Sequence, residues 1–92
     1  MRTKKEKMTS KEPEHETDYC TIWKRASVKI EEDRFAAIEL ITVKELNREE
    51  IRFAYYKLDK NGNLRLIPRP LDVTYSEFNK LIKEAKEKKI ID

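Results

Sequence analysis

The sequence contains very few of the residues from which phosphate loops, disulfide frameworks and zinc sites are built. Its 92 residues include one glycine, three prolines, one cysteine, one histidine and one tryptophan. A single glycine excludes collagen-like repeats and glycine-rich phosphate-binding loops. A single cysteine, Cys20, excludes an internal disulfide framework and a cysteine-based zinc site, and a lone histidine, His15, gives imidazole catalysis little support.

Long apolar runs are also missing from the chain. No run approaches the roughly 18 residues of a membrane span, and the N-terminus has no apolar signal core. We therefore expect a soluble, non-secreted protein without a membrane partner. Its expected location is inside a cell, in the cytoplasm, nucleoid or nucleus, including a host cell if the protein is viral.

Charge is what the sequence has in abundance, because 42% of its residues are charged and 38% are hydrophobic. This length allows one domain, with one small core beneath a heavily solvated surface. The 21 Lys and Arg residues against 18 Asp and Glu residues give a net charge of +3. A surplus of this size is compatible with binding nucleic acid but does not require it.

Residues 1–18 form a polar, highly charged segment whose only apolar side chains are Met1 and Met8. Such a segment buries too little surface to offset the entropy lost on ordering, so we predict a disordered tail followed by a folded domain over residues 19–92. Its early lysines suit a basic arm that touches nucleic acid. A plain solubilising tail, with His15 as a solvated side chain, explains the composition equally well.

From Tyr19 onward the hydrophobic pattern has a period of two residues, which is typical of strands. In Tyr19–Ile30 one face is predicted to be apolar and the other polar with aromatic side chains; the apolar positions are Cys20, Ile22, Ala26, Val28 and Ile30. Phe35–Leu46 is predicted to be a second strand because Ile41-Thr42-Val43 favours β structure. A helical first half is the alternative, since Phe35, Ile38 and Ile41 also share a helical stripe.

Two further strands are predicted around the only glycine of the chain. Ile51–Leu58 alternates, with Arg52 and Tyr56 on the face opposite to Ile51. Asn61-Gly62 then predicts a tight hairpin, because both residues tolerate positive φ. The return strand, Asn63–Val73, contains Pro68 and Pro70, so we expect it at a sheet edge or with a break.

A C-terminal helix is predicted from Thr74 onward. Thr74 and Glu77 have the spacing of a capping box, and Val73 and Phe78 have the spacing of a hydrophobic staple. The apolar stripe of this helix consists of Phe78, Leu81, Ile82 and Ala85. The expected fold class is therefore α+β: a four-stranded antiparallel sheet followed by one helix (β-β-β-β-α), with the helix covering one face of the sheet.

The opposite face of this sheet is predicted to combine aromatic and cationic side chains. Bases stack on aromatic rings and cations neutralise phosphates, so this combination suits single-stranded nucleic acid. Cations on a solvated sheet face are also ordinary, and a single tryptophan commonly serves packing. The candidate nucleic-acid-binding residues are Trp23, Arg25, Lys29, Arg52, Tyr56, Arg65 and Arg69.

Four segments of the second half of the chain form a pattern of their own: Glu50-Ile51-Arg52 through Tyr55-Tyr56, Asp59 to Arg65, Pro68-Arg69, and Leu71-Asp72-Val73-Thr74 leading into Phe78 and Leu81. In this pattern the chain resembles the family of transcriptional positive cofactor 4. The resemblance implies a homodimer whose curved sheets bind single-stranded DNA and whose helices pack in the dimer core. By position it marks Arg52, Tyr56 and Arg69 as DNA contacts, leaving open which of Tyr55 and Tyr56 faces the ligand. The family's Pro-Gly-Arg-Lys-Gly glycines are replaced here by Ile67-Pro68-Arg69-Pro70-Leu71.

Catalysis is not expected. The acidic run Glu31-Glu32-Asp33 could bind a divalent metal, but consecutive residues of a turn point in different directions, which favours a solvated turn. Cys20 lies on the predicted apolar face, which favours a buried, inert thiol over a nucleophile. We therefore expect no enzyme activity, no cofactor and no bound metal.

The function predicted from the sequence is sequence-tolerant binding of single-stranded DNA in transcription, replication or recombination. The expected partners are single-stranded DNA, a second copy of the chain, and transcription or replication proteins. The predicted dimer interface consists of Phe78, Leu81, Ile82 and Ala85. The alternative is a protein-interaction adaptor that recruits a partner through the sheet edge without nucleic acid.

Overall fold

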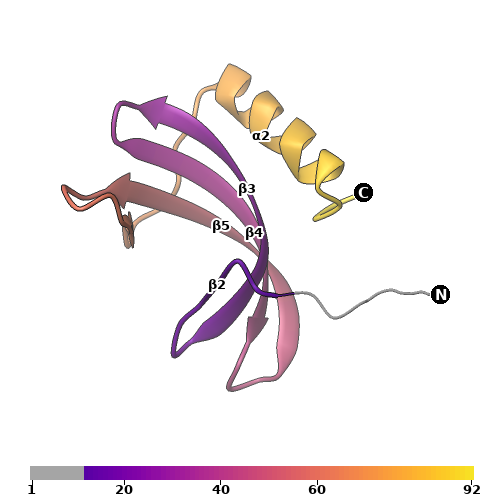
Figure 1. Ribbon diagram of the computed structural model, residues 1–92. Coiled ribbons are helices and arrows are strands. Elements are labelled where there is room, and N and C mark those ends of the chain that lie inside the picture. The colour runs from indigo at the N-terminus through magenta and orange to yellow at the C-terminus, as the bar shows by residue number, and fades with distance from the viewer. Residues whose placement is uncertain (1–11) are drawn as a thin grey trace.

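A computed structural model describes residues 12–92 of the chain as a curled antiparallel sheet with one helix beside it (Figure 1). The five strands occur in the order β2-β3-β4-β5-β6, so each strand pairs with its neighbour in sequence. Their bounds are His15–Glu16 for β2, Cys20–Glu31 for β3, Arg34–Val43 for β4, Arg48–Leu58 for β5 and Leu64–Leu66 for β6; helix α2 spans Tyr75–Glu87. The α+β class and the C-terminal helix agree with the sequence prediction, whereas the predicted number of strands was too low.

The additional strand, β2, lies in the segment predicted to be a disordered tail. His15 pairs with Ile22 and Glu16 pairs with Thr21 along the outer edge of β3. The hydroxyl of Thr17 accepts hydrogen bonds from the backbone N–H groups of Tyr19 and Cys20, which closes the turn between β2 and β3. Main-chain pairing thus orders residues that bury little side-chain surface. The disorder predicted for residues 1–18 is therefore contradicted at His15 and Glu16, which form a strand, and residues 1–11 lie outside the described part of the chain.

The predicted second strand is confirmed as β4, and the helical alternative for Phe35–Ile41 is wrong. β4 ends at Val43 rather than at the predicted Leu46, because residues 44–47 form the turn to β5. Asn47 adopts a φ of 49°, a left-handed conformation that asparagine tolerates better than most residues.

The hairpin predicted at Asn61-Gly62 joins β5 to β6. Gly62 has a φ of 83°, and the Asp59 carboxylate accepts hydrogen bonds from the backbone N–H groups of Asn61 and Asn63. The pKa of the Asp59 carboxyl lies below its usual value, chiefly because of the Asn63 N–H and then the Arg65 guanidinium. Strand β6 is much shorter than the predicted return strand and stops two residues before Pro68, which has no N–H to donate to a ladder.

A register shift between Ile22 and Lys24 exchanges the two faces of β3: side chains of the same parity face one side of the sheet before the shift and the other side after it. Before the shift, Cys20 and Ile22 pack with Ile41 and Val43; after it, the even-numbered residues from Ala26 onward face helix α2. One extra residue in a strand reverses its inward and outward alternation. The prediction that all even positions of Tyr19–Ile30 share one face is therefore wrong.

The sheet consequently has two faces of different character. We call the face of Ala36 and Ile38, which pack against the helix, the helix-side face. We call the face of the alternate β4 residues Ala37, Glu39 and Ile41 the open face. Helix α2 contacts β3 and β4 and leaves the open face uncovered.

Helix α2 buries the central part of its apolar stripe against the sheet of the same chain and also covers the edge of β3. Leu81 and Ala85 are fully buried against the sheet, Ile82 is half-buried and Phe78 is exposed. Because Leu81 and Ala85 already lie in the core of the same chain, they offer no surface to a second copy. The predicted dimer interface therefore cannot include these two residues, whereas its other two members, Phe78 and Ile82, stay predictions.

Two polar contacts fix the helix along the β3 edge. The Glu84 carboxylate accepts a hydrogen bond from the Ser27 N–H at 3.1 Å, and the Lys88 ammonium donates to the Arg25 carbonyl at 2.7 Å. The two helix side chains thus provide hydrogen-bond partners for a backbone N–H and a backbone carbonyl of β3 that face no neighbouring strand at this edge. Within residues 12–92, no helix is long and apolar enough to cross a membrane.

The predicted capping box at the start of α2 is confirmed, and it provides a test of the fold. The Thr74 hydroxyl accepts from the Glu77 N–H at 3.1 Å, and the Glu77 carboxylate accepts from the Thr74 N–H at 2.8 Å. We expect Thr74→Ala to lower the free energy of unfolding by about 1 kcal/mol, because one helix N–H loses its acceptor. Urea unfolding measures this loss; Thr74→Ser should retain most of the stability, and an equal loss in both variants would contradict the capping role.

Candidate nucleic-acid interface

A groove of about 880 Å³ lies on the open face of the curled sheet. Its floor contains Ile22 and Arg25 of β3 with Arg52 and Tyr56 of β5. One wall comes from the β2 segment, including His15 and Tyr19, and the other comes from residues 62–66 of the β5–β6 hairpin. Both walls exist because the outermost strands of the sheet curl over its centre (Figure 1).

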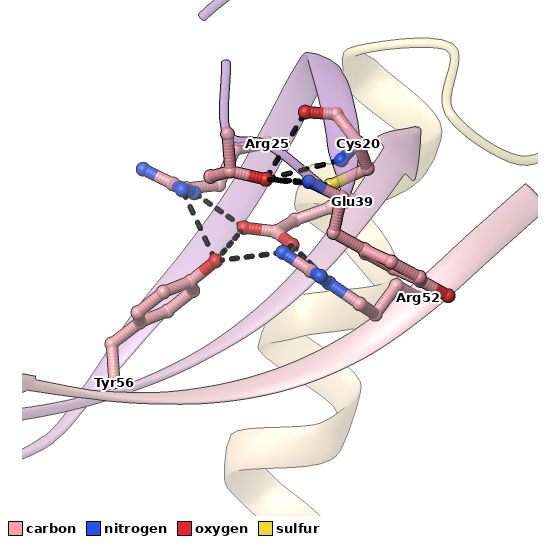
Figure 2. Close-up of polar contacts among 7 residues, drawn as sticks. Cys20, Arg25, Glu39, Arg52 and Tyr56 are labelled. Atoms are coloured by element: carbon pink, nitrogen blue, oxygen red, sulfur yellow. Dashed lines mark hydrogen bonds and ion pairs between the residues drawn. The ribbon is translucent and has the colours of Figure 1, made fainter. Parts of the chain in front are cut away.

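A buried carboxylate organises the floor of this groove. Glu39 lies on β4 between Arg25 of β3 and Arg52 of β5, and strand register places all three in one row. Its side chain is completely buried. The Glu39 carboxylate accepts from Arg25 Nε at 2.7 Å and from Arg52 Nε at 2.9 Å (Figure 2). An unpaired buried carboxylate would be strongly destabilising, and here the two guanidinium groups compensate the buried charge of Glu39.

Tyr56 completes the network and holds the arginines in place. Its hydroxyl donates to the Glu39 carboxylate and accepts from one terminal nitrogen of each arginine, Arg25 and Arg52, at 3.2 Å. The Arg25 guanidinium carbon lies 4.7 Å from the centre of the Tyr56 ring. With 5% of its surface exposed, Tyr56 positions the arginines and does not offer a ring on which a base could stack.

The electrostatics of the network keep both arginines charged. Burial, the largest single influence, lowers the pKa of Arg25 and Arg52, but the contacts with Glu39 and Tyr56 together outweigh it and raise both values overall. Burial, followed by the hydrogen bond to Glu39, raises the pKa of the Tyr56 hydroxyl. One carboxylate between two guanidinium groups leaves one positive charge unbalanced. The remaining N–H donors of this arginine pair, which is partly exposed, are therefore available to an anion.

The structure brings together four of the seven residues predicted to bind nucleic acid. Arg25, Arg52 and Tyr56 share the floor, and Arg65 lies in the hairpin wall. Arg65 is exposed and forms an ion pair of 2.9 Å with Asp59. Alternation along β3 and β5 correctly predicted that the first three share a face.

The other three predicted residues lie elsewhere. The Trp23 indole N–H donates to the Thr42 hydroxyl at 2.9 Å, and Thr42 belongs to the helix-side face, so the register shift in β3 has separated Trp23 from Arg25. Lys29 lies near the β3–β4 turn, where its ammonium nitrogen is 3.7 Å from a carboxylate oxygen of Glu32. Arg69 packs on Tyr55. None of the three lines the groove.

The sequence analysis missed the groove wall that the β2 segment provides. Tyr19 is 57% exposed and lines the groove, as does His15 of β2. Both depend on β2, which has no hydrophobic alternation that could have indicated a strand. Thr17, a common turn former just before the alternating pattern, is the one local signal that this segment folds back.

The residues weighed for catalysis are placed as follows. Residues 12–92 contain no group of three or more His, Cys, Asp or Glu side chains arranged to hold a metal ion. At the β3–β4 turn, the carboxylates of the acidic run face cations: a Glu31 oxygen lies 4.0 Å from Arg34 Nε, and a Glu32 oxygen lies 3.7 Å from Lys29 Nζ. Cys20 is a free, buried thiol packed with Ile22.

Comparison of the chain with protein-family models, curated proteins and solved structures found no match. The resemblance to the positive-cofactor-4 family therefore stays a prediction from the sequence.

Proposed function

We propose that the protein binds single-stranded DNA in the groove on the open face, without strong sequence preference, as part of transcription, replication or recombination. The observation that carries this proposal is the arginine pair, Arg25 and Arg52, fixed on the groove floor by the buried Glu39. Guanidinium groups held in place lose little entropy when they bind phosphate, and their planar donors match its oxygens.

The rest of the groove suits the bases of a single strand. The exposed ring of Tyr19 offers a stacking surface, and Ile22, Leu64 and Leu66 add apolar lining. Base stacking on aromatic rings tolerates any sequence because every base has a flat face. A duplex keeps its bases stacked inside, so it would use only the cations.

Fluorescence anisotropy with labelled oligo-dT, RNA of equal length and duplex DNA, each at several salt concentrations, tests the proposal. We expect the single strand to bind more tightly than the duplex. A plot of log K for the single strand against log[salt] should have a slope of about −0.7 for each phosphate contacted, hence about −1.4 for the arginine pair. Binding that is independent of salt, or tighter for the duplex, would contradict the proposal.

Tyr19 gives a second test that separates stacking from charge. We expect Tyr19→Ala to weaken oligo-dT binding by roughly 1–3 kcal/mol without changing the salt slope, because a stacking surface is lost and no cation is. Tyr75→Ala, at an exposed tyrosine outside the groove, is the matched control and should bind normally. Trp23 emission should stay constant on saturation, and strong quenching would show that DNA contacts the region of Trp23 instead.

We further propose that two copies associate through the free edge of β5. Strand β6 pairs only with residues 56–58 of β5, so among residues 12–92 no strand pairs with the outer edge of Arg48–Phe53. Ile51 and Phe53 are 41% and 59% exposed there. Antiparallel pairing centred on Ile51 would place Glu50 of each copy opposite Arg52 of the other, which is a favourable cross-strand pair.

Ile51→Lys tests this association. We expect the wild-type chain to sediment as a dimer at micromolar concentration and Ile51→Lys to sediment as a monomer, because the variant places two ammonium groups face to face. Leu46→Lys, at another exposed apolar residue, in the β4–β5 turn, is the control and should remain dimeric. A monomeric wild-type chain would contradict the dimer.

The same edge supports the alternative function of a protein-interaction adaptor. An extended peptide could add a strand along Arg48–Phe53 through main-chain hydrogen bonds. Such binding depends little on salt, whereas binding of phosphates falls steeply with it. Affinity for oligo-dT that disappears in groove variants but survives Ile51→Lys would assign the function to the groove rather than to the edge.

A further inference from the structure

A second arginine pair lies away from the groove, around Tyr55. Arg34, at the start of β4, and Arg69, in the segment between β6 and α2, both donate to the Tyr55 hydroxyl, at 3.3 and 3.4 Å. Their guanidinium carbons lie 5.9 and 5.1 Å from the centre of the Tyr55 ring. Three elements separated in sequence thus direct two cations toward one oxygen atom.

This pair differs from the groove pair in its counter-charge. Arg25 and Arg52 share a carboxylate, whereas the acceptor shared by Arg34 and Arg69 is a neutral phenol. The nearest carboxylate to Arg34 is that of Glu31, at 4.0 Å, and Arg69 forms no ion pair with any residue in 12–92. Two guanidinium groups this close repel each other when no anion lies between them.

An oxyanion would supply the missing charge. The hydrogen bonds to Tyr55 lie at the long end of the normal range, so they use little of the donor capacity of either arginine. Arg69 is exposed, which leaves its other N–H groups open to solvent. We propose that Arg34, Tyr55 and Arg69 form a second anion site, which binds a phosphate group.

The site is independent of the groove. Tyr55 and Tyr56 are consecutive in β5, so their side chains lie on opposite faces of the sheet, and Tyr55 pairs with Ala36 of the helix-side face. The proposal therefore stands on its own geometry, whether or not DNA binds in the groove. The phosphate could be free or could belong to a nucleic acid whose path leaves the groove.

Titration with sodium phosphate at constant ionic strength, followed by NMR of the arginine Nε–H groups, tests the site. We expect saturable shifts at Arg34 and Arg69, with sodium chloride producing none. Arg69→Gln should weaken this binding about tenfold, as loss of a charge-assisted hydrogen bond does. Arg48→Gln, at an exposed arginine far along the sheet, is the matched control and should leave it unchanged. Shifts that do not saturate, or that persist undiminished in Arg69→Gln, would overturn the proposal.

The Tyr55 ring gives an independent readout. Hydrogen bonds from Arg34 and then Arg69 hold the pKa of the Tyr55 hydroxyl below its ordinary value. A phosphate that draws these donors away should raise that pKa, and an unchanged value at saturating phosphate would count against the site. Oligo-dT with and without a 5′-phosphate identifies the source: shifts at Arg69 with the phosphorylated strand alone indicate a terminal phosphate, and shifts with both indicate a backbone phosphate. Shifts with inorganic phosphate alone indicate a free ligand.

Discussion

Glu39→Gln is expected to lower the free energy of unfolding by about 3 kcal/mol or more, the cost of breaking a buried charge pair. The carboxylate accepts from Arg25, Arg52 and Tyr56, and its own side chain is completely buried. The amide has nearly the same shape but no charge, and it brings two donors to face groups that already donate. Two partly buried guanidinium groups would then lie close together without an anion.

Urea unfolding of both proteins, followed by circular dichroism, measures this loss. Glu45→Gln, in the exposed β4–β5 turn, is the matched control and should change stability by less than about 0.5 kcal/mol, as surface substitutions usually do. A loss below about 1 kcal/mol for Glu39→Gln would contradict a central role for this carboxylate. The variant should also bind oligo-dT less well, because the arginines lose the contacts that orient them.

Replacing the whole network by apolar residues is expected to abolish DNA binding while keeping the fold. The proposed variant combines Arg25→Leu, Glu39→Leu, Arg52→Leu and Tyr56→Phe. Complete replacement of a buried ionic network by well-packed apolar side chains is often neutral or stabilising, because no charge is left without a partner. We expect stability close to that of the wild-type chain and at least a hundredfold loss of affinity for oligo-dT. The salt slope should fall by about 1.4, since two phosphate contacts disappear.

This variant separates the two roles of the arginines. Anisotropy measures its affinity and salt slope, and urea unfolding confirms that it is folded. Arg48→Gln, which removes an exposed arginine outside the groove, is the control and should bind oligo-dT nearly as the wild-type chain does. A folded network variant that still binds oligo-dT with the wild-type slope would show that the groove floor is not the site.

The candidate site was predictable only in part, and Glu39 shows why. Alternation placed Arg25, Arg52 and Tyr56 on one face, and the structure groups them. Nothing in the local pattern of β4 shows that a charged residue there will be buried between two arginines. The one available signal was a lone charge within the apolar run from Phe35 to Val43, which requires a partner if the strand is central.

The Asn61-Gly62 hairpin and the capping box of α2 were determined by the sequence alone, because each depends on residues close together in the chain. Only the tertiary structure decided which side chains meet. One extra residue in β3 moved Trp23 away from Arg25, and main-chain pairing along β3 added β2 and with it Tyr19. The physical reason is that a strand's faces are set by register with its neighbours, and a shift of one residue reverses them. The burial of Glu39 likewise depends on cations supplied by two other strands, which no local pattern can specify.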